Sequence, residues 1–109
     1  MTASIDTLAK LAQTIRDRRG ASPETSYTAK LLHKGVDKCA KKFGEEAVEL
    51  VIAAMEREPA HVTAEAADVL YHFLVLLTAS GVTLDEVMAE LARRETKSGL
   101  EEKASRKDR

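Results

Sequence analysis

The segment from residue 61 to residue 79, HVTAEAADVLYHFLVLLTA, constrains the fold more than any other part of the chain. After Asp68 its residues are apolar on nearly every face of a helix. Such a helix has to lie inside a protein, because on a surface it would expose apolar side chains to water along its length. The segment holds no glycine or proline until Gly81, so we expect a single buried helix that Gly81 ends.

The remaining sequence also has the spacing of helices and lacks the alternation of β-hairpins, which predicts an all-α fold. Ser26 and Gly35 have the residue types that begin and end a short helix. Pro59 should stop a long one, and Thr83 with Glu86 forms a capping-box pattern. The fold class is a helical bundle of about five helices, at 4–19, 27–34, 36–56, 61–79 and from 83 to about 94.

The length and composition are those of one small soluble domain. The chain has 109 residues, of which we expect 1–97 to form the domain and 98–109 a charged, flexible tail. A net charge of −1 gives no general attraction to nucleic acid or to an anionic membrane, and no apolar run approaches the ~20 residues that span a bilayer. The single Cys39 cannot form an intrachain disulfide. We therefore expect a cytoplasmic protein with neither nucleic acid nor membrane as a partner.

Five acidic residues fall at helical spacing on two of the expected helices. Glu45, Glu46 and Glu49 lie within an arc of about 100° on one helix, and Glu65 and Asp68 stand three residues apart on the next. The first three border an apolar stripe that we expect to belong to the core, namely Val48, Val51, Ile52 and Met55. If the two helices pair antiparallel, the five carboxylates meet at one seam.

Crowded carboxylates repel one another unless cations lie among them. A set of hard oxygen ligands suits Mg²⁺ or Mn²⁺, and the absence of a histidine pair four residues apart argues against zinc. The alternative is a salt-bridged surface seam in which glutamates pair with Lys41 or Lys42. The residues alone leave both interpretations open.

Basic residues come just before the acidic cluster and could attract phosphates, although a solvated helix face would have the same composition. They are Lys30, Lys34, Lys38, Lys41 and Lys42. His72 lies on the same face as Glu65 and Asp68 and is interpreted as a satisfied core histidine rather than as a donor to the acids. Tyr71 is interpreted as a packing residue whose hydroxyl has a partner.

Four stretches of the chain resemble the phosphoribosyl-ATP pyrophosphohydrolase family, an all-α group similar in fold to the MazG-like enzymes. They are SYTAKLLHKG, KKFGEEAVELVIAA, EAADVLYHFLVLL and GVTLDEVMAELARR, which together cover nearly the whole chain. The shared mark of the wider group is E-E-x-x-E followed by E-x-x-D, here Glu45, Glu46, Glu49, Glu65 and Asp68.

The resemblance implies Mg²⁺-dependent hydrolysis of 1-(5-phosphoribosyl)-ATP to phosphoribosyl-AMP and pyrophosphate in histidine biosynthesis. The five acids of the mark would be the metal ligands, and Glu46 or Glu49 would orient or deprotonate the attacking water. Lys30 and Lys42 are the first candidates for phosphate binding, with Arg94 or Arg93 a third.

Two other functions stay open at this point. One is a house-cleaning pyrophosphatase that acts on free nucleoside triphosphates with the same metal site. The other is a non-catalytic helical dimerisation module whose acids only form salt bridges. The apolar circumference of residues 69–77 exceeds what one small domain can cover, so a C₂ homodimer is expected in each case.

Overall fold

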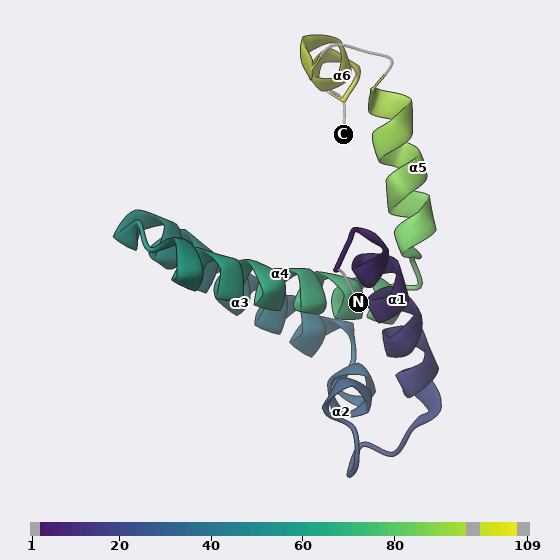
Figure 1. The fold of residues 1–109 in the computed structure, drawn as a ribbon. Helices are drawn as coiled ribbons and strands as arrows, with labels where there is room; N and C mark the ends of the chain where they lie inside the picture. The colour runs from purple at the N-terminus through teal and green to yellow at the C-terminus, as the bar shows by residue number, and fades with distance from the viewer. Residues whose placement is uncertain (1–2, 96–98, 107–109) are drawn as a thin grey trace.

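The computed structural model describes residues 3–95 and 99–106, and within those ranges it contains helices and no strand (Figure 1). The elements are α1 (Asp6–Asp17), the 3₁₀ helix η1 (Arg18–Gly20), α2 (Tyr27–Lys34), α3 (Val36–Glu56), α4 (Pro59–Ala79), α5 (Leu84–Arg94) and α6 (Gly99–Ser105). The all-α prediction is confirmed. The expected first helix, 4–19, is shorter than predicted because its last turn tightens into η1.

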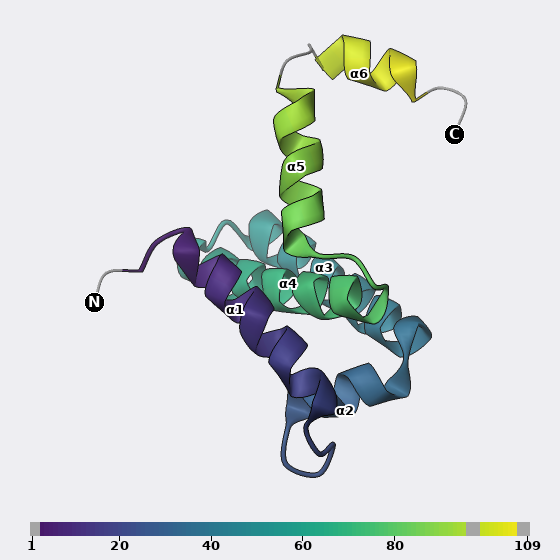
Figure 2. The same cartoon turned by 90° about the vertical axis from the view of Figure 1, so that its right-hand side faces the viewer.

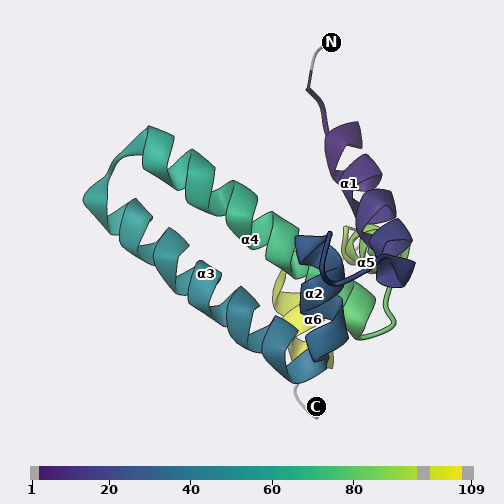
Figure 3. The same cartoon turned by 90° about the horizontal axis from the view of Figure 1, so that it is seen from below.

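The two longest helices, α3 and α4, form an antiparallel hairpin and lie side by side along their length (Figures 1 and 3). The predicted bounds of the first helix, 36–56, are confirmed, but Arg57 and not Pro59 is the residue that ends it. The helix ends at Glu56, where Arg57 takes the left-handed conformation with φ 60°, and Pro59 begins α4. Proline suits the first position of a helix because its fixed φ is helical and its missing N–H needs no partner there.

Helices α1 and α2 pack against the open end of this hairpin, where α3 begins and α4 ends, and complete one core (Figure 3). The Arg19 guanidinium donates to the backbone oxygen of Thr78 over 2.7 Å, and the Cys39 thiol donates to the backbone oxygen of Leu31 over 3.2 Å. Burial raises the pKa of that thiol. The buried core residues are Ala12, Ile15, Leu31, Cys39, Leu74, Val75 and Leu84. The expected central helix, α4, supplies Leu74 and Val75 to this core, but within this chain most of the helix is not buried, contrary to the prediction.

Helix α4 is long and apolar enough to cross a membrane by length and composition alone. Only 22% of that stretch is buried within this chain. The helix carries Glu65 and Asp68 beside an acidic residue of α3, and such groups are costly in a bilayer. Within this chain, part of its apolar stretch belongs to the core and the rest is left uncovered.

The apolar stripe of α3 does not lie in the core of this chain, contrary to the sequence-based expectation. Val48, Val51, Ile52 and Met55 are 57%, 61%, 45% and 75% exposed. Helix α3 instead packs with its buried residues Cys39 and Ala53 inward, which turns the stripe outward. The stripe is therefore an apolar surface that this chain leaves uncovered.

Helices α5 and α6 extend away from the α3–α4 hairpin (Figures 1 and 2). The predicted capping box begins α5, since the Thr83 hydroxyl accepts from the Glu86 amide and the Glu86 carboxylate accepts from the Thr83 amide. Leu84 is the buried residue of this helix. Helix α6 was not predicted and lies in the segment expected to be a tail. The division into a domain and a flexible tail stays a prediction, and residues 98 and 107–109 lie outside the described residues.

Candidate metal centre and basic pocket

Three of the five predicted acidic residues converge across the α3–α4 seam. Glu46 of α3 and Glu65 and Asp68 of α4 each offer a carboxylate oxygen within 4.8 Å of the other two. The antiparallel hairpin brings them together because the residues stand at similar distances from the turn on the two helices. Glu46 and Glu65 are half-buried and Asp68 is exposed, so the cluster opens to solvent on one side.

Glu45 and Glu49 lie outside this group of three, and both are exposed. Successive residues on a helix are rotated by about 100°, so Glu45 points about 100° and Glu49 about 60° to the same side of Glu46. Glu45 lines the basic pocket described below. The roles of Glu45 and Glu49 as metal ligands, and of Glu46 or Glu49 as the base, stay predictions.

His72 is buried beside the acidic cluster, in agreement with its interpretation as a core histidine. It is 5% exposed, and its Nε2 atom lies 3.9 Å from Oε1 of Glu46. Burial lowers the pKa of His72, an effect that the nearby Glu46 carboxylate opposes. The ring also meets Tyr71 edge-on with centroids 4.9 Å apart. A buried imidazole of this kind forms one wall of the cluster.

A second histidine, His61, contacts the cluster from outside, and the sequence reasoning did not single it out. Its Nε2 atom lies 3.5 Å from Oε1 of Glu65, and its Nδ1 atom lies 2.8 Å from Oε1 of Glu56. The hydrogen bond with Glu56 is the main cause that raises the pKa of His61. The spacing of four residues to Glu65 was the signal that could have revealed this contact.

All five lysines of the predicted basic patch line one pocket of about 280 Å³ between α2 and α3. Its lining is Tyr27, Lys30, Leu31, Lys34, Lys38, Lys41, Lys42 and Glu45. Lys42 links this pocket to the acidic cluster, since its Nζ atom lies 4.0 Å from Oε1 of Glu46. A pocket with this charge suits an anion, and the neighbouring carboxylates suit a cation.

Tyr27, which lines this pocket, and its neighbour Tyr71 differ in their surroundings. The Tyr71 hydroxyl forms a hydrogen bond with the Thr28 hydroxyl, which confirms that Tyr71 is a packing residue with a hydroxyl partner. Tyr27 is 55% exposed and its ring stacks on Tyr71 at a centroid distance of 6.4 Å. Part of the Tyr27 ring therefore remains accessible at the pocket wall.

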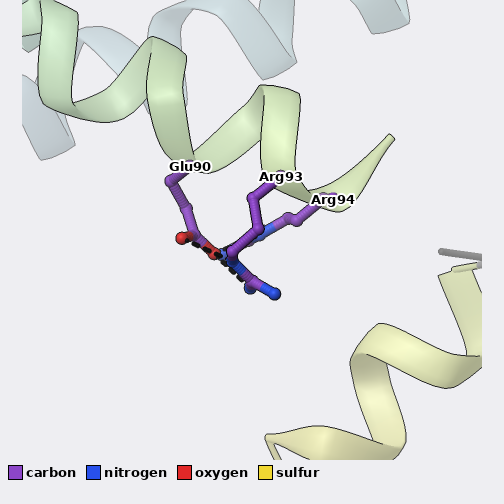
Figure 4. Close-up of polar contacts among 3 residues, drawn as sticks. All are labelled: Glu90, Arg93 and Arg94. Carbon is purple, nitrogen blue, oxygen red and sulfur yellow. Dashed lines mark hydrogen bonds and ion pairs between the residues drawn. The ribbon is translucent and has the colours of Figure 1, made fainter. Parts of the chain in front are cut away.

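Arg94, the third predicted phosphate ligand, lies on α5 and not at this pocket. Glu90 accepts hydrogen bonds from both Arg93 and Arg94, with 3.0 Å from the Arg94 Nε atom to Oε2 (Figure 4). The pair of arginines thus shares one carboxylate on an extended helix. Among the residues that the structure describes, Arg94 neither belongs to the acidic cluster nor lines the basic pocket, so its role as a phosphate ligand stays a prediction.

The shared carboxylate gives a pH-dependent contribution from α5. Arg93 first, and then Arg94, lower the pKa of Glu90 from 4.5 to about 2. A depressed pKa in the folded state stabilises above the unfolded value, and this contribution is lost as the pH falls from about 4.5 through 2. Because the pair is exposed, the effect should be small. We expect wild-type protein to melt slightly above Glu90→Gln at neutral pH, with most of the difference lost by pH 2. An unchanged difference at pH 2 would contradict this.

The acidic cluster fits a hard divalent cation. Two ligand oxygens on one Mg²⁺ ion lie at most about 4.2 Å apart, so oxygens within 4.8 Å need only small side-chain rotations to share an ion. Carboxylate oxygens are the donors that Mg²⁺ and Mn²⁺ prefer, and the open side leaves room for water ligands. Glu46, Glu65 and Asp68 are the residues that would hold it.

An all-α chain that sets an acidic cluster at a helix hairpin beside a lysine-lined pocket has the features of an all-α pyrophosphohydrolase. Residues 8–95 match the family described as phosphoribosyl-ATP pyrophosphohydrolase, and the chain belongs to that family.

Curated relatives match over almost their full length. Phosphoribosyl-ATP pyrophosphatase 1 of Bradyrhizobium diazoefficiens is 63% identical over 102 residues, which cover 94% of this chain and 96% of the relative. Phosphoribosyl-ATP pyrophosphatase of Paracoccus denitrificans is 62% identical over 100 residues, or 92% of this chain and 93% of the relative. The protein of the same name from Dinoroseobacter shibae is 62% identical over 99 residues, which cover 91% of this chain and 97% of the relative.

Proposed function

We propose that this chain is a phosphoribosyl-ATP diphosphatase, which hydrolyses 1-(5-phosphoribosyl)-ATP to 1-(5-phosphoribosyl)-AMP and pyrophosphate in histidine biosynthesis. The observation that carries the proposal is the 63% identity to a phosphoribosyl-ATP pyrophosphatase over nearly the whole of both chains. The lysine-lined pocket beside a carboxylate cluster agrees with a substrate that carries several phosphates. As a soluble biosynthetic enzyme, it would work in the cytoplasm.

In the reaction, one water molecule is consumed and the phosphoanhydride bond between the α- and β-phosphates breaks. Lys30 and Lys42 would bind the phosphate oxygens from the pocket and hold the chain of phosphates against the acidic cluster. Glu46 or Glu49 would orient the water and accept its proton. A bound Mg²⁺ ion supplies charge neutralisation at the phosphates and lowers the pKa of the attacking water.

A panel of substrates tests the assignment against a house-cleaning pyrophosphatase. Release of pyrophosphate from phosphoribosyl-ATP should exceed release from ATP, dUTP and the other common nucleoside triphosphates at equal concentration. Faster hydrolysis of a free nucleotide would overturn the histidine-pathway assignment and leave the wider class in place.

The dependence of the melting temperature on Mg²⁺ distinguishes an enzyme with a metal centre from a non-catalytic dimerisation module. A ligand that binds only the folded state stabilises it by RT ln(1 + [L]/Kd), which is about 2.7 kcal/mol at a hundredfold excess over Kd. We expect the melting temperature to rise with Mg²⁺ concentration. A melting temperature indifferent to millimolar Mg²⁺ would count against a metal centre and against catalysis.

The biological unit would be an isologous C₂ homodimer. The support is the exposed stripe on α3 together with α4, most of whose apolar stretch this chain leaves uncovered. In such a dimer Arg94 on the extended α5 could reach the acidic cluster of the other chain.

Sedimentation equilibrium should give the mass of two chains at micromolar concentration. Mixing inactive Asp68→Asn with inactive Arg94→Ala should then restore about a quarter of the wild-type activity, because half of the dimers are mixed and each has one intact site. A monomer with full turnover would refute both the dimer and the shared site, and a dimer without complementation would refute the shared site alone.

A further inference from the structure

We propose that Tyr27 is a platform on which the adenine base of a nucleotide substrate stacks while the phosphates bind to the lysines of the same pocket. The proposal rests on the proposed function and adds to it a residue that recognises the base. It is carried by the exposure of the Tyr27 ring at the basic pocket, by the side chains that contact this ring, and by its place beside the acidic cluster.

Tyr27 is the aromatic residue among the described residues that line a mostly basic pocket. Five of the eight lining residues are lysines, and Tyr27 joins them with 55% of its surface exposed. Lysines attract phosphates by their charge, whereas an aromatic ring offers a face on which any base can stack. Cations beside an exposed aromatic ring are the combination that binds single nucleic-acid strands. The same combination suits a free nucleotide, which has a base and phosphates in one molecule.

Two neighbouring rings hold the Tyr27 side chain in its orientation. The Tyr27 ring lies nearly parallel to that of Tyr71, with an interplanar angle of 16° and a centroid distance of 6.4 Å. It meets the His72 ring at 89°, with the centroids 6.5 Å apart. Tyr71 is itself fixed, because its hydroxyl is hydrogen-bonded to the Thr28 hydroxyl. A ring held in this way loses little conformational freedom when a base stacks on it.

The start of α2 fixes the backbone that carries this ring. Tyr27 is the first residue of the helix, and the preceding Ser26 caps it by accepting a hydrogen bond from the Ala29 amide over 3.1 Å. Lys30 follows Tyr27 by three residues, which places both side chains on the same face of α2. The helix thus presents an aromatic ring and a candidate phosphate ligand side by side.

The width of one side chain separates the Tyr27 ring from the acidic cluster. Tyr27 contacts His72, and the Nε2 atom of His72 lies 3.9 Å from Oε1 of Glu46. A nucleotide has a matching order, since one ribose separates the base from the α-phosphate. With the base on Tyr27, the phosphates would extend toward Lys42, whose Nζ atom lies 4.0 Å from the same oxygen of Glu46. The bond that the proposed reaction breaks would then lie beside the proposed metal ligands.

A purely structural role for Tyr27, as a support for Tyr71 and for the start of α2, gives a different result. Its loss would then lower the melting temperature and weaken the binding of every anion at the pocket in equal proportion. For a stacking platform, the melting temperature changes little because the ring is exposed, and the loss of affinity is confined to ligands that carry a base.

The test uses the full chain in the presence of Mg²⁺ and compares the binding of two probes by titration calorimetry. One probe is α,β-methylene-ATP, in which a methylene group replaces the bridging oxygen of the bond that would break, and the other is inorganic triphosphate, which has no base. Tyr27→Ala should weaken the binding of α,β-methylene-ATP about tenfold, the lower end of what loss of a stacking aromatic residue costs, and leave that of inorganic triphosphate unchanged. Tyr27→Phe should bind both probes like wild type, whereas Tyr27→Leu, which keeps apolar volume without a ring, should share most of the loss. Lys30→Met is the matched control on the same helix and should weaken both probes.

Equal affinities of wild type and Tyr27→Ala for α,β-methylene-ATP, or an equal loss for both probes, would overturn the stacking role and leave the phosphate pocket in place. A wild-type protein that binds neither probe would overturn the phosphate pocket of the proposed function, and the role of Tyr27 with it. If Tyr27→Ala does not fold, the comparison of Tyr27→Leu with Tyr27→Phe decides the question, because equal affinities of these two variants for α,β-methylene-ATP contradict stacking on the ring.

Discussion

Asp68→Asn is expected to lower kcat/KM for phosphoribosyl-ATP at least about 100-fold, equivalent to about 2.7 kcal/mol of transition-state stabilisation. Asp68 supplies one of the three carboxylates that meet across the α3–α4 seam, and an amide is a poor ligand for Mg²⁺ at a position where charge is needed. The substitution preserves shape and removes one negative charge. The loss should therefore come with a weaker response of the melting temperature to Mg²⁺.

The fold should survive this change, because Asp68 is exposed and the cluster loses one repulsive partner. Without metal, Asp68→Asn should melt at the wild-type temperature or above it. Asp17→Asn at the end of α1 is a matched control, since Asp17 is exposed and lies in a different helix from the acids. Wild-type turnover in Asp68→Asn, or an equal loss in Asp17→Asn, would refute the assigned site.

Local signals explain which parts of the fold were predictable. Helices α2 and α5 begin where predicted, because each N-cap involves residues only three apart in the sequence. The Ser26 hydroxyl accepts from the Ala29 amide, and Thr83 and Glu86 form the capping box. The end of α3 at residue 56 was predicted, but it was attributed to Pro59, because proline can both stop one helix and start the next; in the structure Arg57 ends α3 and Pro59 begins α4.

Features that depend on packing were harder to predict. The spacing of Val48, Val51, Ile52 and Met55 identifies an apolar face but not whether this chain or another one covers it. Helix α6 was missed because it lacks the apolar face on which helix prediction relies, and its Leu100 is 82% exposed.

The acidic site was partly predictable for a geometric reason. Antiparallel pairing of two helices is enough to bring Glu46 opposite Glu65 and Asp68. The positions of these acids in the sequence therefore predict that they meet at one seam. The spacing does not decide how the helix is rotated about its axis, and this rotation separates Glu46 from Glu45 and Glu49. The two contacts of His61 depend on the turn geometry, which the sequence does not specify.

Lys42→Met is expected to lower kcat/KM about 10- to 100-fold, that is, by about 1.4 to 2.7 kcal/mol. Lys42 lines the basic pocket, and its Nζ atom is 4.0 Å from the Glu46 carboxylate, so it lies between the proposed phosphate pocket and the proposed metal ligands. Methionine keeps much of the length and the apolar stem of the side chain while removing its charge. If Lys42 binds phosphate equally in the ground state and the transition state, the loss should appear in KM rather than kcat.

Two controls separate this effect from a general loss of positive charge or of stability. Lys10→Met removes the same charge from an exposed position on α1 outside the pocket, and its kinetics should match those of wild type. The pair between Lys42 and Glu46 is partly exposed, so its loss should cost about 0.5 kcal/mol of folding stability or less. Lys42→Met should also make KM less sensitive to salt, because one phosphate contact fewer is screened. Unchanged KM and kcat in Lys42→Met would show that phosphates do not bind at this end of the pocket, whereas an equal loss in Lys10→Met would make the effect one of overall charge.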